Sequence, residues 1–353
     1  MKNNFDKERK EQLKNKIFQK IDKHDSHRRI KRVSIISGVA ASLALGMFFF
    51  SIYNATEQPS LLLQKAASSA NLNNYGNEVK LILNNKKEVN IAEKKSTLVY
   101  SNNGKTVNIN NEKNIDQPME TTNKISYNTI VVPFGKKSQL TLSDGSIVWL
   151  NSGSKLTYPS VFDTKKREVH LVGEAIFEVA HNANSPFHVL VDGNDIKVLG
   201  TIFNVSSYPD DNNISTALQK GSIEITYTEK GQFFDSKESL IISPGTLATY
   251  NKNKVKLNLK KVDMTPYFSW RDGVFIFKKN NLQDIMKKIS RHYGVTITIA
   301  DSILLQKTFS GKLDINNDLN TVMKIMKKTS KFEFEENANG IIITKPNTNP
   351  ERQ

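Results

Sequence analysis

The acidic residues of this chain include one pair whose spacing can be tested against a known chemistry. Glu174 and Glu178 lie four residues apart in a predicted strand, so their side chains share one face. At roughly 3.3 Å per residue the two positions are about 13 Å apart, whereas the paired carboxylates of a glycosidase stand roughly 5 to 9.5 Å apart. The spacing therefore argues against a glycosidase site.

Histidines and a glycine-lysine run are the other chemical candidates. The run at 135–138, Gly-Lys-Lys-Ser, lacks the spaced glycine that precedes a phosphate-binding loop. The chain has no cysteine, so neither a disulfide framework nor a thiolate metal site can form. We expect no metal, no cofactor and no enzyme active site among these residues. Four histidines lie beyond residue 100, and none has the H-x-x-x-H spacing of a zinc site: His170, His181, His188 and His292.

The longest element that the sequence predicts is a single transmembrane helix. Residues 33–53, VSIISGVAASLALGMFFFSIY, contain no charged side chain. As a helix this stretch would reach roughly 31 Å, enough to cross a hydrocarbon core about 30 Å thick. A buried core helix is one alternative, although such helices usually keep a polar edge. A cleaved signal peptide is another, although its apolar region usually spans about 7 to 15 residues.

The charges on either side of this span predict its orientation. The twenty residues that follow it offer one basic residue, Lys65, and one acidic residue, Glu57. Because basic segments stay in the cytoplasm, we expect the N-terminus inside and the rest of the chain outside. Six basic residues precede the span within a short distance: Lys20, Lys23, Arg28, Arg29, Lys31 and Arg32.

The distribution of charge argues against a nucleic-acid partner. The chain has 50 Lys plus Arg and 35 Asp plus Glu. The first 32 residues contain 12 basic and 5 acidic side chains, or +7, which leaves 38 and 30, or +8, for the remainder. The excess is concentrated at the membrane end, where it can meet anionic lipid. Because no interleaved aromatic and basic motif accompanies it, we expect no direct contact with DNA or RNA.

Residues 1–32 predict a short amphipathic helix. Leu13, Ile17 and Ile21 recur at steps of four, and Phe18 lies beside them. A segment of this size cannot bury a core of its own, so its apolar stripe needs a partner protein or the membrane surface. The alternative is a basic topology signal without a partner.

The region after the span divides into a stalk and a β domain. Residues 54–78 are rich in Ser, Ala, Gln and Asn, as expected of a stalk. Residues 79–262 contain short alternating strands about every ten residues, closed by Asn, Asp and Gly turns. This pattern predicts a mainly β protein with an all-β domain. The periodicity does not choose among a sandwich, a barrel and a twisted solenoid.

Residues 263–345 predict a small α+β module. Asn280 or Asn281 caps a helix that ends at Gly294, and Asp318 caps a second helix. Four short strands, near residues 297, 310, 333 and 342, accompany the helices. We expect two helices packed on one sheet, followed by a loose polar tail at 346–353.

Motifs in the β domain and the C-terminal module resemble a known family, the FecR-type transmembrane sensors. The module, with Trp270-Arg271-Asp272-Gly273 and Arg291-x-Tyr293-x-Val295, is similar to the secretin/TonB N-terminal (STN) domains found in Bacteroidetes-type members. The resemblance covers roughly residues 79 to 345 and the anchor. The motifs of the β domain match in order and spacing: Val132-Pro133-x-Gly135, Leu140-Thr141-Leu142-Ser143-Asp144-Gly145, Val148-Trp149-Leu150-Asn151, Leu156-Thr157-Tyr158-Pro159, Gly173-Glu174-Ala175-x-Phe177-x-Val179, Pro186-Phe187 and Val198-Leu199-Gly200-Thr201-x-Phe203-x-Val205.

The resemblance implies a signal relay across the inner membrane. In that family a TonB-dependent outer-membrane transporter, loaded with iron chelate or glycan, presents its periplasmic signalling domain to the C-terminal part of the sensor. The cytoplasmic end controls an extracytoplasmic-function sigma factor, as an anti-sigma factor. The sigma-binding segment of such proteins is usually longer than the 32 residues present here.

Two partner sites follow as expectations. The helix face of residues 1–32 would lie in a groove of the sigma factor. An exposed sheet edge in the C-terminal module would accept a strand of the transporter's signalling domain. The residues expected to bind are Leu13, Ile17, Phe18 and Ile21 for the sigma factor, and Ile341, Ile342, Ile343 and Thr344 for the transporter.

The resemblance also implies one possible reaction, at Gly200-Thr201. Several FecR-type proteins are reported to cleave themselves at a matching pair. There a threonine hydroxyl next to a strained peptide attacks the preceding carbonyl, and water completes the cut. The alternative is structural, with Gly200 permitting a bend between strands and Thr201 serving as a β-branched strand residue.

A second functional class remains open from the sequence. The β domain could bind carbohydrate or act as an envelope scaffold, with the anchor as a tether. A sugar-binding face needs exposed aromatic residues, and 8% of the chain is aromatic, with two tryptophans.

Overall fold

The computed structural model describes residues 14, 45–46, 61–68, 76–117, 125–231 and 235–346. The predicted cytoplasmic segment, the predicted span and the polar tail after Pro346 therefore lie almost entirely outside the described residues. None of the helices within these ranges is long and apolar enough to cross a bilayer. The chain divides into two compact units, residues 1–58 and 59–353, and the second contains the fold described below.

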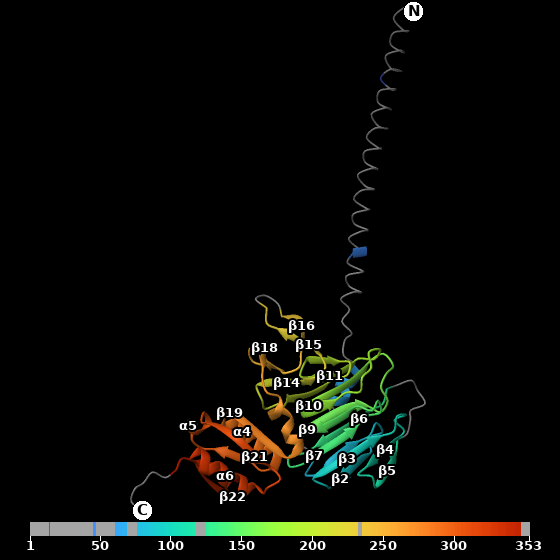
Figure 1. Cartoon of the computed structure of the whole chain (residues 1–353). Coiled ribbons are helices and arrows are strands. Elements are labelled where there is room, and N and C mark those ends of the chain that lie inside the picture. The colour runs from blue at the N-terminus through green and yellow to red at the C-terminus, as the bar shows by residue number, and fades with distance from the viewer. Residues whose placement is uncertain are drawn as a thin grey trace, which may run out of the picture. The chain divides into compact units, whose positions relative to one another are not determined.

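The prediction of a mainly β protein is confirmed (Figure 1). The β domain contains these strands: β1 (Val79–Ile82), β2 (Glu88–Ile91), β3 (Lys95–Tyr100), β4 (Thr106–Ile109), β5 (Lys113–Asp116), β6 (Tyr127–Val132), β7 (Lys137–Thr141), β8 (Ile147–Leu150), β9 (Ser154–Pro159), β10 (Arg167–Glu178), β11 (Phe187–Val191), β12 (Asn194–Val198), β13 (Ile202–Ser207), β14 (Asn213–Lys220), β15 (Ile223–Glu229), β16 (Ser236–Ile242), β17 (Thr246–Asn251) and β18 (Lys256–Lys261).

These strands form one curled sheet with two layers around a shared core. In layer A the hydrogen-bonded order is β2-β1-β6-β9-β10-β11-β12-β15-β16. In layer B it is β5-β4-β3-β7-β8-β10-β13-β14-β17-β18. Buried residues of both layers belong to one apolar cluster, in which Phe177 and Phe203 stack with ring centroids 5.2 Å apart.

Strand β10 belongs to both layers. Its first half pairs with β9 and β11 in layer A, and its second half, from Gly173, pairs with β8 and β13 in layer B. Gly173 has φ +97°, a conformation that residues with a Cβ rarely adopt. A Cβ there would lie 2.5 Å from the Ser154 Oγ atom. The Gly173-Glu174 motif therefore marks the point where the strand passes from one layer to the other.

Part of the predicted stalk is a helix that packs on the β domain. Helix α2 (Leu61–Ser68) contacts β6, β9 and β10, and its Leu63 and Ala67 are buried. The Lys155 ammonium group donates a hydrogen bond to the Ala67 carbonyl oxygen at 2.6 Å. A cation at the last turn of a helix suits the negative end of its dipole. Residues 61–68 are thus attached to layer A rather than extending freely from it.

The C-terminal module contains the two predicted helices with the predicted caps. The Asn281 and Asp318 side chains accept hydrogen bonds from the first-turn N–H groups of α4 and α6, and Gly294 ends α4 with φ +71°. The elements of the module are α3 (Thr265–Phe268), the 3₁₀ turn η2 (Ser269–Asp272), β19 (Val274–Asn281), α4 (Leu282–Tyr293), β20 (Ile297–Ile299), α5 (Ser302–Leu305), β21 (Thr308–Asp314), α6 (Leu319–Ser330), β22 (Glu333–Asn337) and β23 (Gly340–Thr344).

The prediction of two helices on one sheet is wrong, because the strands form two separate sheets. β19 pairs with β21, and β23 pairs with β20 and β22. α4 contacts both β19 and β20, and α6 contacts both β21 and β22. The buried side chains of α4 and α6 share one apolar cluster with strand residues of both sheets. Each helix therefore buries two faces, one against each sheet.

The expected sheet edge at Ile341, Ile342, Ile343 and Thr344 is also corrected. These residues form β23, the central strand of its sheet, which pairs in parallel with β20 and antiparallel with β22. Its backbone groups are already used, so it cannot accept a further strand. The outer strands of this sheet are β20 and β22.

Replacement of Gly173 by Ala tests the passage of β10 between layers. The added Cβ meets Ser154 and the positive φ is strained, so we expect the free energy of unfolding to fall by roughly 3 kcal/mol or more. Gly193→Ala is the matched control, because Gly193 has φ +80° but open space around it, and it should cost about 1 kcal/mol. Urea unfolding of the full chain in detergent measures both. Equal losses would contradict the role given to Gly173.

Candidate functional site

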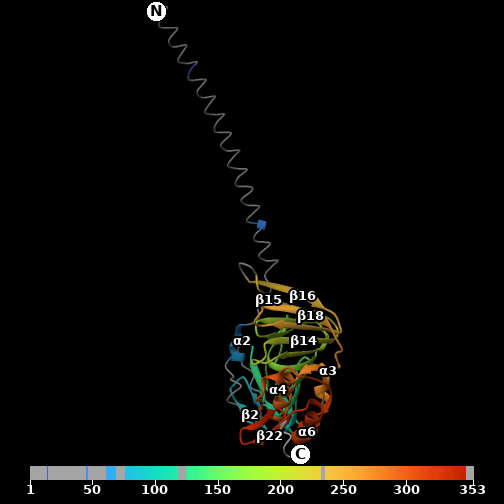
Figure 2. The same cartoon turned by 90° about the vertical axis from the view of Figure 1, so that its left-hand side faces the viewer.

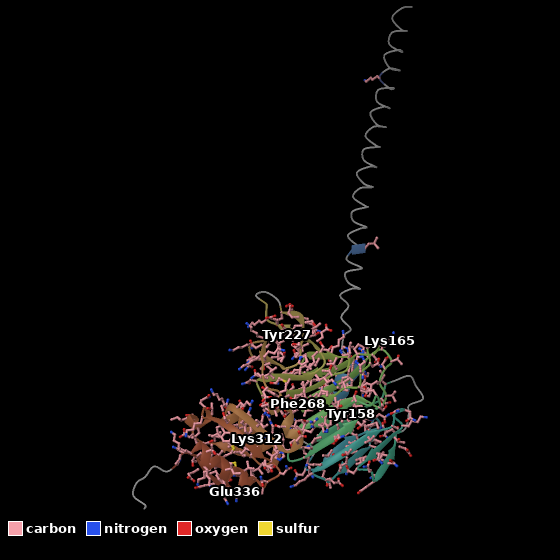
Figure 3. All side chains as sticks on the ribbon, viewed as in Figure 1. Tyr158, Lys165, Tyr227, Phe268, Lys312 and Glu336 are labelled. Atoms are coloured by element: carbon pink, nitrogen blue, oxygen red, sulfur yellow. The ribbon has the colours of Figure 1, made fainter. Side chains whose placement is uncertain are left out.

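The β domain and the C-terminal module meet on the outer face of layer B. One row of neighbouring side chains crosses this face, and its apolar members pack into the cluster of the module. The row is covered by α3 and η2. Phe268 of α3 lies between the two parts of the fold (Figure 3). The row is Trp149, Ile176, Asn204, Ala217 and Leu247.

A buried arginine holds the two parts together at one side of this contact. Arg291, in α4, donates from its Nη2 atom to Asp210 at 2.7 Å and to Asp211 at 2.9 Å. Its guanidinium group lies 3.7 Å from the ring centroid of Tyr208. Lys287, one turn earlier, donates to Asp211 at 3.0 Å. Because Arg291 is buried, these charge-assisted bonds are stronger than those of an exposed pair.

Further bonds join the loop before β7, and the first residue of β7, to the module. The Gly135 amide donates to the Arg291 carbonyl oxygen at 2.9 Å. The Lys137 ammonium donates to the Trp270 carbonyl oxygen at 2.7 Å and lies 5.5 Å from the centroid of the Trp270 ring. Burial, with the nearby charge of Lys95, lowers the pKa of Lys137 to about 8. The glycine-lysine run thus makes an internal contact between domains.

A small polar pocket lies between the two parts. Its volume is about 50 Å³, room for a few waters but far below the 300 Å³ or so of a typical metabolite site. The buried Nε1 atom of Trp270 and the Nδ1 atom of His292 have no hydrogen-bond partner. The lining residues are Asn151, Glu174, Ser206, Tyr208, Asp211, Pro266, Trp270, Phe275, Lys288, Arg291 and His292.

Polar side chains that line the pocket are hydrogen-bonded to neighbouring groups of the fold. The two carboxylate oxygens of Glu174 accept hydrogen bonds from Asn151 at 2.8 Å and from Asn204 at 3.2 Å, whereas Glu178 is exposed. His292 donates from Nε2 to the Ile315 carbonyl oxygen at 2.9 Å, and burial lowers its pKa to about 4. No cluster of acidic or histidine side chains that could hold a metal occurs in the described part of the chain. The site is a contact between domains.

Gly200 and Thr201 lie where β12 gives way to β13. A Cβ on Gly200 would lie 2.8 Å from the Cα atom of His181, so the glycine permits a close approach of two chain segments. The buried Thr201 hydroxyl donates to the Ser222 carbonyl oxygen at 3.1 Å. Neither residue has a positive φ. These contacts give both residues a structural role.

The residues that join the two domains could not be identified from the sequence, although several of them lie in the motifs that resemble the FecR family. Arg291, Trp270 and Trp149 belong to motifs given no function, and Asp210 and Asp211 belong to none. The sequence feature that pointed to this contact was the position of both tryptophans within these motifs. The expected sigma-binding residues Leu13, Ile17, Phe18 and Ile21 lie outside the described residues.

Two family models match the regions that meet at this junction. Residues 128–224 match the model described as FecR protein, and residues 274–343 match the model described as FecR, C-terminal. Over these two regions the chain matches a FecR domain followed by a FecR C-terminal domain. No curated protein matches the chain.

Solved structures support the fold of these FecR domains. Two crystal structures of a candidate anti-sigma factor from Parabacteroides distasonis ATCC 8503 are each 24% identical to the chain, with a TM-score of 0.56. Each alignment covers 62% of this chain and 99% of the other. At 24% identity this similarity is evidence for the fold alone.

Replacement of Arg291 by Met tests the junction. Met keeps an apolar stem against Tyr208 but leaves Asp210 and Asp211 without the guanidinium group. We therefore expect the free energy of unfolding to fall by about 2 kcal/mol. Hydrogen exchange should increase in residues 264–273, which cover layer B. Lys287→Met, which removes a more exposed cation from the same aspartates, is the control and should change exchange much less. Unchanged exchange in Arg291→Met would contradict the proposed role.

The buried His292 predicts a fall in stability at acidic pH. Its folded pKa of about 4 lies below the unfolded value of roughly 6.5, so the unfolded chain binds more protons between these values. Neutral His292 therefore contributes up to about 3 kcal/mol to the free energy of unfolding above pH 6.5, and this contribution is lost as the pH falls to 4. Urea unfolding at several pH values should show a shallower fall for His292→Gln than for the parent chain. The exposed His181→Gln variant should keep the parental slope.

Proposed function

We propose that this chain is a FecR-type, single-pass inner-membrane sensor that regulates an extracytoplasmic-function sigma factor. The observation that carries the proposal is the order of parts along the chain. An uncharged stretch of 21 residues precedes a FecR domain, which is followed by a FecR C-terminal domain. In this arrangement residues 1–32 are cytoplasmic and the two FecR domains are periplasmic.

The C-terminal domain receives the signal in this proposal. Its partner is the periplasmic signalling domain of a TonB-dependent outer-membrane transporter. Strand addition would use an outer strand, β20 or β22, because β23 is already paired on both sides. β22 presents Glu333, Glu335 and Glu336, so a strand added there would be favoured by basic side chains.

The cytoplasmic helix transmits the signal. Leu13, Ile17, Phe18 and Ile21 form its apolar face, and the sigma factor supplies the groove that buries it. The name of the crystallised Parabacteroides protein, a candidate anti-sigma factor, is in keeping with this role. The protein acts as a regulator and has no catalytic function of its own.

A carbohydrate-binding role has less support from the structure. Trp270 is 3% exposed. Trp149 packs under the Arg271 guanidinium group, whose central carbon lies 5.0 Å from the centroid of the Trp149 ring. Both tryptophans are therefore engaged at the junction and are not available to stack on a sugar.

Co-purification from cells tests the relay. The full chain, tagged at its C-terminus, should retain a sigma factor that mass spectrometry identifies, and a chain lacking residues 1–32 should not. Ile17→Asp places a charge on the apolar face and should also abolish recovery, whereas Asn15→Asp, off that face, should not. Recovery of the same envelope proteins by every variant, without a sigma factor, would support the scaffold role instead.

Self-cleavage is tested at Thr201. We expect Thr201→Ala to give the same bands on a gel as the parent chain, because the hydroxyl serves a hydrogen bond to Ser222. Thr201→Ser keeps a nucleophile and is the control. A parental fragment that begins at residue 201, persists in Thr201→Ser and disappears in Thr201→Ala would establish cleavage.

A further inference from the structure

Two turns of this chain contain an asparagine followed by a glycine. Asn103-Gly104 joins β3 to β4, and Asn339-Gly340 joins β22 to β23. In such a pair the backbone nitrogen of the glycine can attack the side-chain amide carbon of the asparagine, because glycine has no Cβ to hinder the approach. Asparagine is accordingly one of the thermolabile residues of proteins. The two turns have the same chemistry in their sequence, so the fold decides which of them reacts.

The Asn103 side chain is held by its own turn. Its Oδ1 atom accepts hydrogen bonds from the Ser101 hydroxyl at 2.8 Å and from the Lys105 amide at 3.0 Å. The Gly104 amide donates to the Ser101 carbonyl oxygen at 2.8 Å, so the attacking nitrogen is also engaged. A Cβ on Gly104 would clash with the Ser160 carbonyl oxygen, which shows how closely this turn packs on its neighbour. Both reacting groups of this pair are therefore fixed.

The Asn339 side chain is exposed at the turn between β22 and β23. Its backbone amide donates to the Asn337 Oδ1 atom at 2.8 Å, but its side-chain amide makes no hydrogen bond in the described part of the chain. Figure 2 shows β22 at the end of the unit opposite β15, β16 and β18, and Figure 3 places Glu336 of β22 at the surface of that end. The side-chain amide is therefore open to water and free to rotate toward the backbone of Gly340.

The backbone that follows Asn339 is tightly placed. Gly340 has φ +125°, and a Cβ there would clash with the Thr296 carbonyl oxygen. The next amide, that of Ile341, donates to the same oxygen at 2.9 Å. This bond joins the start of β23 to the residue just before β20, with which β23 pairs in parallel. A longer turn would have no space on this side.

We propose that Asn339 is a self-modification site, converted in the folded chain to aspartate and isoaspartate. The Gly340 nitrogen gives up its proton and bonds to the Asn339 Cγ atom, and the side-chain nitrogen leaves as ammonia, which carries that proton away. The product is a five-membered succinimide ring. Water then adds to one of the two ring carbonyl carbons and breaks its bond to the ring nitrogen, which leaves either aspartate or a backbone lengthened by one carbon. One water enters and one ammonia leaves, and the reaction needs neither the membrane anchor nor a sigma factor.

The isoaspartate product would change the β22–β23 hairpin. Its extra backbone carbon lies directly before Gly340, which cannot move toward Thr296, so the Ile341 amide loses its bond to the Thr296 carbonyl oxygen. The new carboxylate also joins Glu335 and Glu336 at the end of β22. Both changes fall on the three-stranded sheet of the C-terminal domain, so the modified chain would have a looser and more acidic sheet.

Incubation of the full chain in detergent at mildly alkaline pH tests the site. Peptide mapping by mass spectrometry follows Asn103 and Asn339 in one sample, and the ammonia released is measured alongside. We expect progressive conversion of Asn339 and an unmodified Asn103. Asn339→Gln should remove most of the ammonia, because the longer side chain closes a six-membered ring much more slowly. In urea, where both turns are lost, the two asparagines should react at similar rates.

The same samples can overturn the proposal. Reaction of Asn339 in urea but not in the folded chain would show that the hairpin protects it. Equal conversion of Asn103 and Asn339 in the folded chain would show that the bonds from Ser101 and Lys105 give no protection.

Hydrogen exchange tests the effect on the sheet. The isoaspartate form, separated by ion exchange, should show faster exchange at Ile341 than the parent chain. Asn339→Asp adds the charge without the extra backbone carbon and is the matched control, so it should keep the parental exchange rate. A parental rate at Ile341 in the isoaspartate form would contradict the loss of the bond to Thr296.

Discussion

Strand β10 is the constraint on which the rest of the fold depends. Its backbone supplies hydrogen bonds to layer A before Gly173 and to layer B after it. The Ser154 hydroxyl bonds both the N–H and the carbonyl oxygen of Glu174, the residue after Gly173. Asn151 and Asn204 donate hydrogen bonds to the Glu174 carboxylate. A disturbance at this passage therefore affects both layers, and neither layer can form its complete core without the other.

The same strand determines where the C-terminal domain lies. Ile176 points outward from its second half and begins the contact with α3 and η2. Arg291 then fixes the orientation of α4 through Asp210 and Asp211. Apolar burial holds the domain on the sheet, while the buried ion pairs and the small polar pocket select one arrangement of it. The two FecR domains thus form one continuous structure across the junction.

Features that depend on near neighbours in the chain were predictable. The caps at Asn281 and Asp318 and the helix end at Gly294 follow from local hydrogen bonds and from the conformational freedom of glycine. Features that depend on distant pairing were not. The short apolar run at 341–344 reads the same for an edge strand and for the central strand that β23 is. Arg291 meets Asp211 across 80 residues of sequence.

The connection of α2 to β10 has a mechanical consequence. α2 contacts the first half of this strand, and the C-terminal domain packs on the second half. A tensile load applied between the C-terminal domain and α2 would run lengthwise along β10. Its hydrogen bonds to the neighbouring strands lie across that direction and would be loaded together, in shear, rather than broken one after another. The pairing of β10 on both sides would therefore resist such a load along the whole strand.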